Sequence, residues 1–237
     1  MNLPTGKAKK AYVSRMFTGL SGNYDLVNSI CSLFIDHAWR RAAIKALGNA
    51  PAGRVLDLCA GTLPLSMTFL KRAPGNIVAV DISEGMLRTG ARRLAGKFPA
   101  ERLGAVCGDG ERLPLGNQTC DGAMVAFGIR NLADMELGFL ELCRVMRPRA
   151  PLVILEFSRP KNHLFAFIYL LYLKWILVPV GTLLTGDRDA YRYLVRSIEA
   201  FPPPEEVASR LRTTGFTHIR TTPLTGGIVT LYKAERA

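Results

Sequence analysis

Three aspartates lie at the ends of successive apolar runs: Asp57 in VLDLCAGTLPL, Asp81 in NIVAVD and Asp109 in GDGERLPL. If these runs are parallel strands, their carboxyl ends meet at one edge of a sheet and the three carboxylates gather there. A carboxylate at that edge can accept hydrogen bonds from ribose hydroxyls, and a nearby glycine lets a ligand approach the backbone. The spacing predicts a nucleoside site, although the same acids could instead only cap helices and solvate strand ends.

The loop after the first run distinguishes two kinds of nucleoside cofactor. It retains one glycine, Gly61, whereas loops that bind a dinucleotide pyrophosphate carry three. S-adenosylmethionine (SAM) carries no phosphate; it needs close backbone approach, a carboxylate for its ribose and polar partners for its amino-acid part. The residues placed to meet these needs are Asp57, Gly61, Thr62, Asp81, Asp109 and Gly110. Three strand-end aspartates in succession favour a SAM site over the alternative in which these acids only cap helices and solvate strand ends.

Positioning these residues requires an alternation of strands and helices, which the chain shows from residue 54 onward. Strands are expected over residues 54–59, 76–81, 104–109, 121–127, 151–157, 217–222 and 226–234, with helices over 65–71, 83–95, 133–146 and 204–216. The alternation predicts an α/β fold: a Rossmann-like, doubly wound, mostly parallel seven-stranded sheet with helices on both faces. We expect one domain over residues 1–237.

Two helical segments are expected outside this alternation. After a basic tail, residues 24–47 have the spacing of one long helix or two short ones, within an N-terminal helical segment of residues 1–50. A helical insertion over 161–202 is expected to cap the carboxyl edge of the sheet. Its apolar part, Leu164 to Leu184, is long enough to span a bilayer, but Lys174, Pro179 and Gly181 interrupt it. We therefore expect two short apolar helices that pack on the domain or rest against lipid.

Composition narrows the class of partner. The net charge of +12 indicates an anionic partner, either nucleic acid or a membrane surface. Nucleic acid is disfavoured because the aromatic residues cluster in the apolar insertion rather than among the basic residues. Five scattered cysteines without a CxxC pair indicate reduced thiols in a cytoplasm and no metal site. The basic N-terminus has no apolar core, so a secretory signal is not expected.

Several longer motifs carry a resemblance to a known family. YDLVN, FGIRN, LEFSRP, YRYLVRSI and TGGIV occur in the order and spacing of the ubiquinone/menaquinone biosynthesis C-methyltransferase family, which the chain resembles from Tyr24 to Leu231. The resemblance implies methyl transfer from SAM to a ring carbon of a polyprenylated hydroquinone such as demethylmenaquinol. It leaves open a naphthoquinol or benzoquinol ring, and a homodimer or biosynthetic complex. The positions that match cofactor contacts are Thr62, Asp81, Ile82, Asp109, Gly110 and Ala126, the last where serine is common.

The loop departs from the family pattern, since Ala60, Leu63 and Pro64 replace Gly, Gly and Asp. Ala60 is tolerable if its φ is negative, and Leu63 if its side chain enters the core. Pro64 suits the first turn of a helix, where no N–H donor is needed. We expect an altered but functional loop. The alternative is an inactive, methyltransferase-like scaffold that binds quinone, or a methyltransferase for RNA or another small molecule.

The resemblance also suggests which residues act on the ring. Arg130 follows the fourth strand, where its guanidinium can stabilise the quinolate, and Asn131 can orient the hydroxyl or a water molecule. Glu156 ends the fifth strand and is the expected proton acceptor, through water; the alternative is a structural ion pair with Arg130. Tyr24 and Asp25 are expected to fold over the cofactor from the N-terminal helix, with Tyr24 also contacting the substrate; the alternative is that they cap the start of that helix. Tyr191 and Tyr193 are expected to line the quinone pocket, or else to pack in the core.

An isoprenoid tail would hold such an enzyme at a bilayer, because each buried CH₂ contributes about 0.8 kcal/mol. We therefore expect a cytoplasmic protein bound peripherally to the inner face of the cytoplasmic membrane. The apolar insertion would form the entrance for the tail. The basic residues expected to attract anionic lipid are Lys7, Lys9, Lys10 and Arg15.

Overall fold

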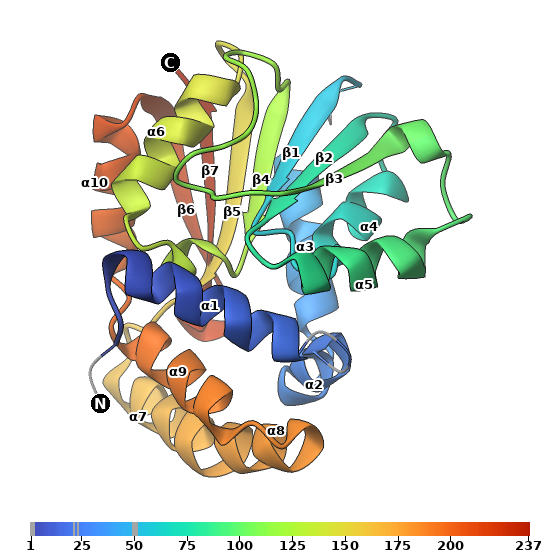
Figure 1. Cartoon of the computed structure of the whole chain (residues 1–237). Coiled ribbons are helices and arrows are strands. Elements are labelled where there is room, and N and C mark those ends of the chain that lie inside the picture. The colour runs from blue at the N-terminus through green and yellow to red at the C-terminus, as the bar shows by residue number, and fades with distance from the viewer. Residues whose placement is uncertain (1–2, 21, 23, 49–51) are drawn as a thin grey trace.

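Seven strands form one sheet in the order β3-β2-β1-β4-β5-β7-β6 (Figure 1). The computed structural model describes residues 3–20, 22, 24–48 and 52–237. The strands are β1 (Arg54–Leu58), β2 (Asn76–Asp81), β3 (Leu103–Cys107), β4 (Gly122–Ala126), β5 (Pro151–Phe157), β6 (Phe216–Leu224) and β7 (Val229–Arg236). The first five pair in parallel, and β7 pairs antiparallel with both β5 and β6. The predicted mostly parallel, seven-stranded sheet is confirmed.

Both faces of the sheet are apolar, because the central strands have no polar alternation. Leu56 and Leu58 of β1 enter one core, with α6 (Met135–Val145) and α10 (Pro204–Thr213). Val55 enters the core on the opposite face, with α3 (Asp36–Ala46), α4 (Pro64–Leu70) and α5 (Glu84–Leu94). Since successive side chains of a strand point to opposite faces, a continuous apolar run requires helices on both. Figure 1 shows these two helical layers.

From β1 the chain builds the sheet first to one side, through β2 and β3, and then to the other side, beginning with β4. In such sheets a crevice lies beyond the carboxyl ends of the strands at the point of reversal. Helix α1 (Gly6–Leu20) lies across this edge, within the N-terminal segment of residues 1–50 that was expected to be helical (Figure 1). It packs against α5 and the turn Ile129–Asn131, burying Val13 and Leu20. These contacts join the helix to distant parts of the chain, so its position over the sheet edge depends on tertiary packing.

The segment 24–47 forms two short helices, α2 (Tyr24–Cys31) and α3. The break comes at Leu33 and Phe34, which are left-handed with φ of 52° and 61°. Both side chains are exposed. A right-handed helix requires negative φ, so the chain cannot continue as one helix through these two left-handed residues.

The insertion forms one continuous helical stretch instead of the two separate helices expected. Helix α7 (His163–Tyr172) passes through a π turn (Leu173–Leu177) into α8 (Val178–Thr185), and α9 (Arg188–Glu199) packs back against them. Pro179 falls in the first turn of α8, directly after the π turn. Proline has no backbone N–H, and at this position none is needed for the helix. The stretch His163–Thr185 is long and apolar enough to cross a membrane, and 22% of its most apolar window is buried in the fold.

Candidate active site

The loop between β1 and α4 is tightly wound. Cys59, Gly61 and Leu63 are left-handed, with φ of 56°, 54° and 66°, whereas Ala60 is not among the residues with positive φ. The Leu63 side chain is fully buried. The two conditions under which the substituted loop keeps its shape are therefore met. A left-handed leucine costs about 1–2 kcal/mol, which burial of its side chain, worth about 2 kcal/mol, offsets.

Asp81, at the end of β2, holds this loop. Its two carboxylate oxygens accept hydrogen bonds from the backbone N–H groups of Gly61 (2.9 Å) and Ser83 (2.8 Å). The Thr62 hydroxyl donates to Asp25 of α2 at 2.6 Å. Gly61, Thr62 and Asp81 therefore lie together as the sequence predicted, and Asp25 joins them from the N-terminal segment.

Asp109, in the turn after β3, is tied to α1. One carboxylate oxygen accepts the N–H of Glu111 at 2.9 Å, and the other accepts a hydrogen bond from Lys10 Nζ at 2.6 Å. Lys10 also pairs with the Glu111 carboxylate at 2.7 Å. The neighbouring Gly110 is closely packed, since a Cβ there would meet Leu58 Cδ1 at 3.1 Å.

Two of the lysines of α1, Lys9 and Lys10, are bound to groups within the fold rather than left for lipid. Lys9 Nζ donates to the carbonyl oxygens of Arg130 (2.9 Å) and Leu132 (2.6 Å), and Lys10 is engaged at Asp109. Burial lowers the pKa of Lys9. The expected attraction of these two residues to lipid is corrected: they fasten α1 over the carboxyl edge, because their partners lie on the turns beneath it. Sequence reasoning missed this role, and only the apolar helical spacing of residues 12–20 signalled it.

Asp57 is buried beneath the loop and accepts a hydrogen bond from the Ser66 hydroxyl at 2.6 Å. Burial raises its pKa to about 7, although the bond from Ser66 opposes the shift. Asp57 lines the cavity described below, as predicted for the cofactor end. It also supports the loop from below by joining β1 to α4.

The raised pKa of Asp57 predicts a pH-dependent stability. The unfolded carboxyl loses its proton near pH 4 and the folded one near pH 7, so the folded state binds more protons between these values. The free energy of unfolding should therefore fall from pH 4 to pH 7 by up to about 4 kcal/mol from this group, and level off above. Urea unfolding of wild type and Asp57→Asn measures the difference, since asparagine keeps the acceptor for Ser66. Parallel pH profiles for the two proteins would contradict the assignment.

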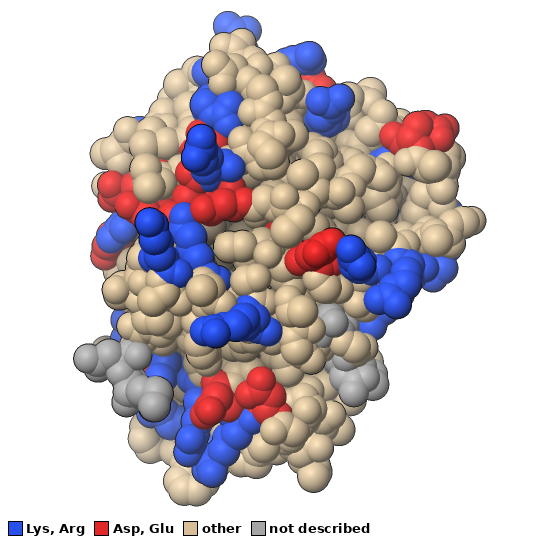
Figure 2. Space-filling view, in the orientation of Figure 1, with Lys and Arg blue, Asp and Glu red and all other residues tan. Residues whose placement is uncertain are grey.

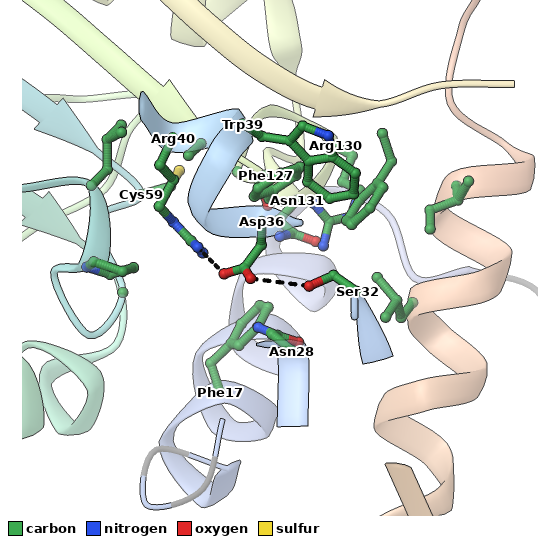
Figure 3. Close-up of a pocket in the computed structure, with 18 of the residues that line it drawn as sticks. Phe17, Asn28, Ser32, Asp36, Trp39, Arg40, Cys59, Phe127, Arg130 and Asn131 are labelled. Carbon is green, nitrogen blue, oxygen red and sulfur yellow. Dashed lines mark hydrogen bonds and ion pairs between the residues drawn. The ribbon is translucent and has the colours of Figure 1, made fainter. Parts of the chain in front are cut away.

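A cavity of about 430 Å³ runs from this edge into an apolar chamber. Its polar end is lined by all the residues predicted to bind cofactor: Asp57, Gly61, Thr62, Asp81, Ile82, Asp109, Gly110 and Ala126. Its apolar end is lined mainly by aromatic and aliphatic side chains, including Trp39, Phe127, Phe157 and Leu173. Figure 3 shows Trp39, Phe127, Arg130 and Asn131 together in this wall. The site therefore joins a nucleoside-sized polar end to a chamber for an apolar molecule.

Arg130 and Asn131 line the cavity, but Glu156 does not. Glu156 is fully buried, and its carboxylate accepts hydrogen bonds from the Arg130 guanidinium (2.8 Å) and from the N–H groups of Arg130 (3.1 Å) and Phe157 (2.9 Å). The assignment of Glu156 as proton acceptor is corrected for this reason: it stands behind Arg130, as in the structural ion pair that was the alternative. The Arg130 guanidinium lies 5.3 Å from the centre of the Phe157 ring.

The three predicted substrate tyrosines fall elsewhere. Tyr191 and Tyr193 line a small neighbouring pocket rather than the cavity, and the side chain of Tyr24 lies outside the described residues. The Tyr193 hydroxyl donates to Asn131 Oδ1 at 3.2 Å. Tyr193 therefore holds Asn131, a residue of the cavity wall, without lining the cavity itself. The position predicted for Tyr191 and Tyr193 is thus corrected. The tyrosines that line the cavity in their place are Tyr169 and Tyr172 of α7.

A buried ion pair in the cavity wall was missed from sequence. Asp36 and Arg40 lie one turn apart on α3 and pair with each other, and the Ser32 hydroxyl donates to Asp36 at 3.0 Å (Figure 3). The Arg40 guanidinium lies 5.9 Å from the centre of the Phe127 ring. The signal in the sequence was the four-residue spacing of opposite charges around Trp39, which usually marks an exposed helix face.

Comparisons with known proteins agree with this geometry. The model of the ubiE/COQ5 methyltransferase family matches residues 5–236. The chain is 41% identical to the ubiquinone/menaquinone biosynthesis C-methyltransferase UbiE of Syntrophotalea carbinolica, covering 94% of this chain and 93% of that protein. It is also 41% identical to the demethylmenaquinone methyltransferase of Mycolicibacterium vanbaalenii, covering 95% of each.

Solved structures share the fold at low sequence identity. The phosphoethanolamine N-methyltransferase 2 of Haemonchus contortus in complex with SAM superposes with a TM-score of 0.65 at 13% identity, over 84% of this chain and 52% of that one. A SAM-dependent methyltransferase of Thermotoga maritima gives a TM-score of 0.62 at 15% identity, over 94% of this chain and 99% of that one. With the family model spanning the fold and the site, the chain belongs to the ubiE/COQ5 methyltransferase family.

Proposed function

We propose that this protein transfers the methyl group of SAM to a ring carbon of a polyprenylated hydroquinone of the demethylmenaquinol type. The observation that carries the proposal is one cavity whose polar end holds strand-end carboxylates and whose other end is apolar, with Arg130 in its wall. Such a reaction requires a nucleoside cofactor and an apolar ring with its tail to meet in one enclosed space. The names of the relatives support the same substrate class.

The donor set at the polar end fits SAM. Asp81 uses its oxygens to hold the loop and keeps lone pairs for the ribose hydroxyls, while Asp109 stands at the end of the next strand for the adenine. Gly61 and Thr62 bring backbone close to the amino-acid part. When bound, SAM supplies an electrophilic methyl group on a cationic sulfur, which an acidic edge favours.

The residues of the chamber suit the ring chemistry. A hydroquinone carbon becomes nucleophilic once an adjacent hydroxyl gives its proton to water, because the charge spreads from oxygen to the ortho carbon. After methyl transfer that carbon loses its own proton to water and the ring regains its aromaticity. A guanidinium beside that oxygen lowers the pKa of the hydroxyl and stabilises the anion, which is the role of Arg130. Glu156 fixes the guanidinium, and Asn131, held by Tyr193, keeps its amide nitrogen free to donate to the substrate.

The decisive experiment incubates the protein with SAM and short-tailed demethylmenaquinol, and detects the methylated product by mass spectrometry. A demethylated benzoquinol tested in parallel decides the ring type, and we expect the naphthoquinol to be preferred. Calorimetry with SAM accompanies the assay. SAM binding without product from either ring would contradict the proposal and favour the quinone-binding scaffold.

The face of the molecule shown in Figure 2 does not support an RNA substrate. Figure 2 shows Lys and Arg on one face in several separate groups with Asp and Glu between them, rather than in one continuous tract. A nucleic-acid groove would require clustered basic side chains with aromatic residues among them.

The apolar insertion supports attachment to a membrane surface at the cytoplasmic face. Leu164, Trp175 and Leu183 are 70%, 75% and 85% exposed, and the nearby chain turn exposes Leu33 and Phe34. Leu33 also lines the cavity, as does the exposed Ile168 of α7, so the apolar surface continues into the site. A tail could pass from lipid to the chamber without crossing water.

Replacing Trp175 and Leu183 together with serine should reduce binding to anionic vesicles by at least about 10-fold, since each side chain buried in lipid contributes about 2 kcal/mol. Vesicle flotation measures the loss. The matched control replaces Leu137 and Leu140, exposed leucines of α6, with serine and should bind as wild type does. Equal losses in the two variants would contradict attachment through the insertion.

A further inference from the structure

One hydroxyl in the cavity wall has no explanation in the fold. Tyr169 of α7 lines the cavity and is only 5% exposed, yet its hydroxyl oxygen has no hydrogen-bond partner among the described residues. A buried polar group without a partner is costly and uncommon, and phenylalanine would fill the same space without that cost. A ligand in the cavity is therefore the natural partner.

The neighbouring Tyr172 provides the contrast. It lies one turn later on α7 and also lines the cavity, but its hydroxyl donates to the backbone carbonyl of Cys31. That bond joins α7 to the end of α2. Tyr172 thus has a structural role, whereas the Tyr169 hydroxyl is left for whatever enters the chamber.

The surroundings of Tyr169 connect it to the reacting end of the chamber. Its ring packs with Leu173 and Ile198 in a cluster that borders Phe157, whose ring faces the Arg130 guanidinium. Burial raises the pKa of Tyr169, opposed by the nearby charge of Arg130. The hydroxyl therefore stays protonated at neutral pH and can donate a hydrogen bond.

We propose that the Tyr169 hydroxyl donates a hydrogen bond to the quinol oxygen that carries the negative charge during methyl transfer. The inference rests on the proposed function and adds to it a residue that contacts the substrate. Arg130 would meet the anion as a cation from the turn after β4, and Tyr169 would meet it as a neutral donor from α7. Two donors on one oxygen also fix the orientation of the ring, and so the carbon that is methylated.

The test compares Tyr169→Phe with Tyr172→Phe. For Tyr169→Phe, kcat/KM for the quinol should fall about 10- to 100-fold, as expected for a lost hydrogen bond to a charged group, with the Kd for SAM unchanged. Its Tm should stay the same or rise, because a buried hydroxyl without a protein partner is removed. Its kcat–pH profile should shift to higher pH, since the anion is less stabilised. Tyr172→Phe should instead lower Tm, with a smaller loss in kcat/KM.

An unchanged kcat/KM in Tyr169→Phe would overturn the inference, and so would a fall in Tm with equal losses toward SAM and quinol, which indicates packing alone. If wild type methylates no quinol, the proposed function fails separately. Binding of a short-tailed hydroquinone then decides, measured by quenching of Trp39 fluorescence with Trp175 replaced by phenylalanine in every protein compared, because Trp39 lines the same cavity and Trp175 does not. Weaker binding to Tyr169→Phe than to wild type supports the contact, and equal binding overturns it.

Discussion

Replacing Arg130 with methionine is expected to lower kcat for quinol methylation by about 10²- to 10³-fold, while the Kd for SAM stays within a few-fold of wild type. Loss of a preorganised donor that faces developing charge has effects of this size. The guanidinium lines the chamber end of the cavity, whereas the cofactor residues lie on the loop and strand ends. Single-turnover kinetics and calorimetry separate the two effects.

The single substitution also leaves Glu156 buried without its cation, which typically costs about 3–5 kcal/mol of stability. The double variant Arg130→Met with Glu156→Gln removes both charges. The single glutamine oxygen can accept only one of the two backbone N–H groups, at positions 130 and 157, that the two carboxylate oxygens accept separately. We expect the double variant to recover part of the lost Tm but none of the kcat. Recovery of both would assign Arg130 a purely structural role, and equal losses in kcat and SAM affinity would move it to cofactor binding.

Replacing Gly90 with alanine is expected to destabilise the protein by about 1–3 kcal/mol and to weaken SAM binding about 10-fold. Gly90 lies inside α5, where alanine alone would favour the helix by about 1 kcal/mol. A Cβ there, however, would stand 2.6 Å from the carbonyl carbon and oxygen of Thr62 and 2.7 Å from Leu63 Cγ. Backbone cannot rotate away, so the cofactor loop must shift.

The expected change in the free energy of unfolding thus has the opposite sign to the change that helix propensity alone predicts, so the measurement distinguishes the two effects. Gly19→Ala in α1 is the matched control, because a Cβ at Gly19 has nothing within 4 Å. That variant should be as stable as wild type or up to about 1 kcal/mol more stable. Urea unfolding and SAM calorimetry on both proteins test the prediction, and a stabilised Gly90→Ala with normal SAM affinity would contradict it.

The sheet and the polar end of the site could be derived from sequence because both depend on local patterns. Strands buried on both faces read as unbroken apolar runs, and the acids that follow them must gather at one edge if the strands are parallel. Pro64 in the first turn of α4 was likewise a local feature. The shape of the substituted loop between β1 and α4 could also be foreseen, since it depended only on the φ angle of Ala60 and on the burial of the Leu63 side chain.

The chamber end could not be derived in the same way, because its lining depends on how distant segments pack. Four tyrosines were available in the insertion and α9, and helical spacing alone does not say which of them turn toward the cavity. Tyr169 and Tyr172 of α7 do so, whereas the ring of Tyr191 packs against Gly181. Glu156 was placed correctly at a strand end, but only its three hydrogen bonds show that it faces Arg130 rather than substrate.

Sequence by itself determined the family, the succession of strands and helices along the chain, and the carboxylates at the strand ends, because periodicity and strand ends are set by residues near one another in the chain. Tertiary structure alone decided the order of the strands in the sheet and the fastening of the N-terminal helix α1 over the site. Lys9 and Lys10 find their partners about a hundred residues away, at Arg130, Leu132 and Asp109. A charged side chain has the same helical propensity whether it faces solvent or a buried carbonyl, so only the packed chain distinguishes the two.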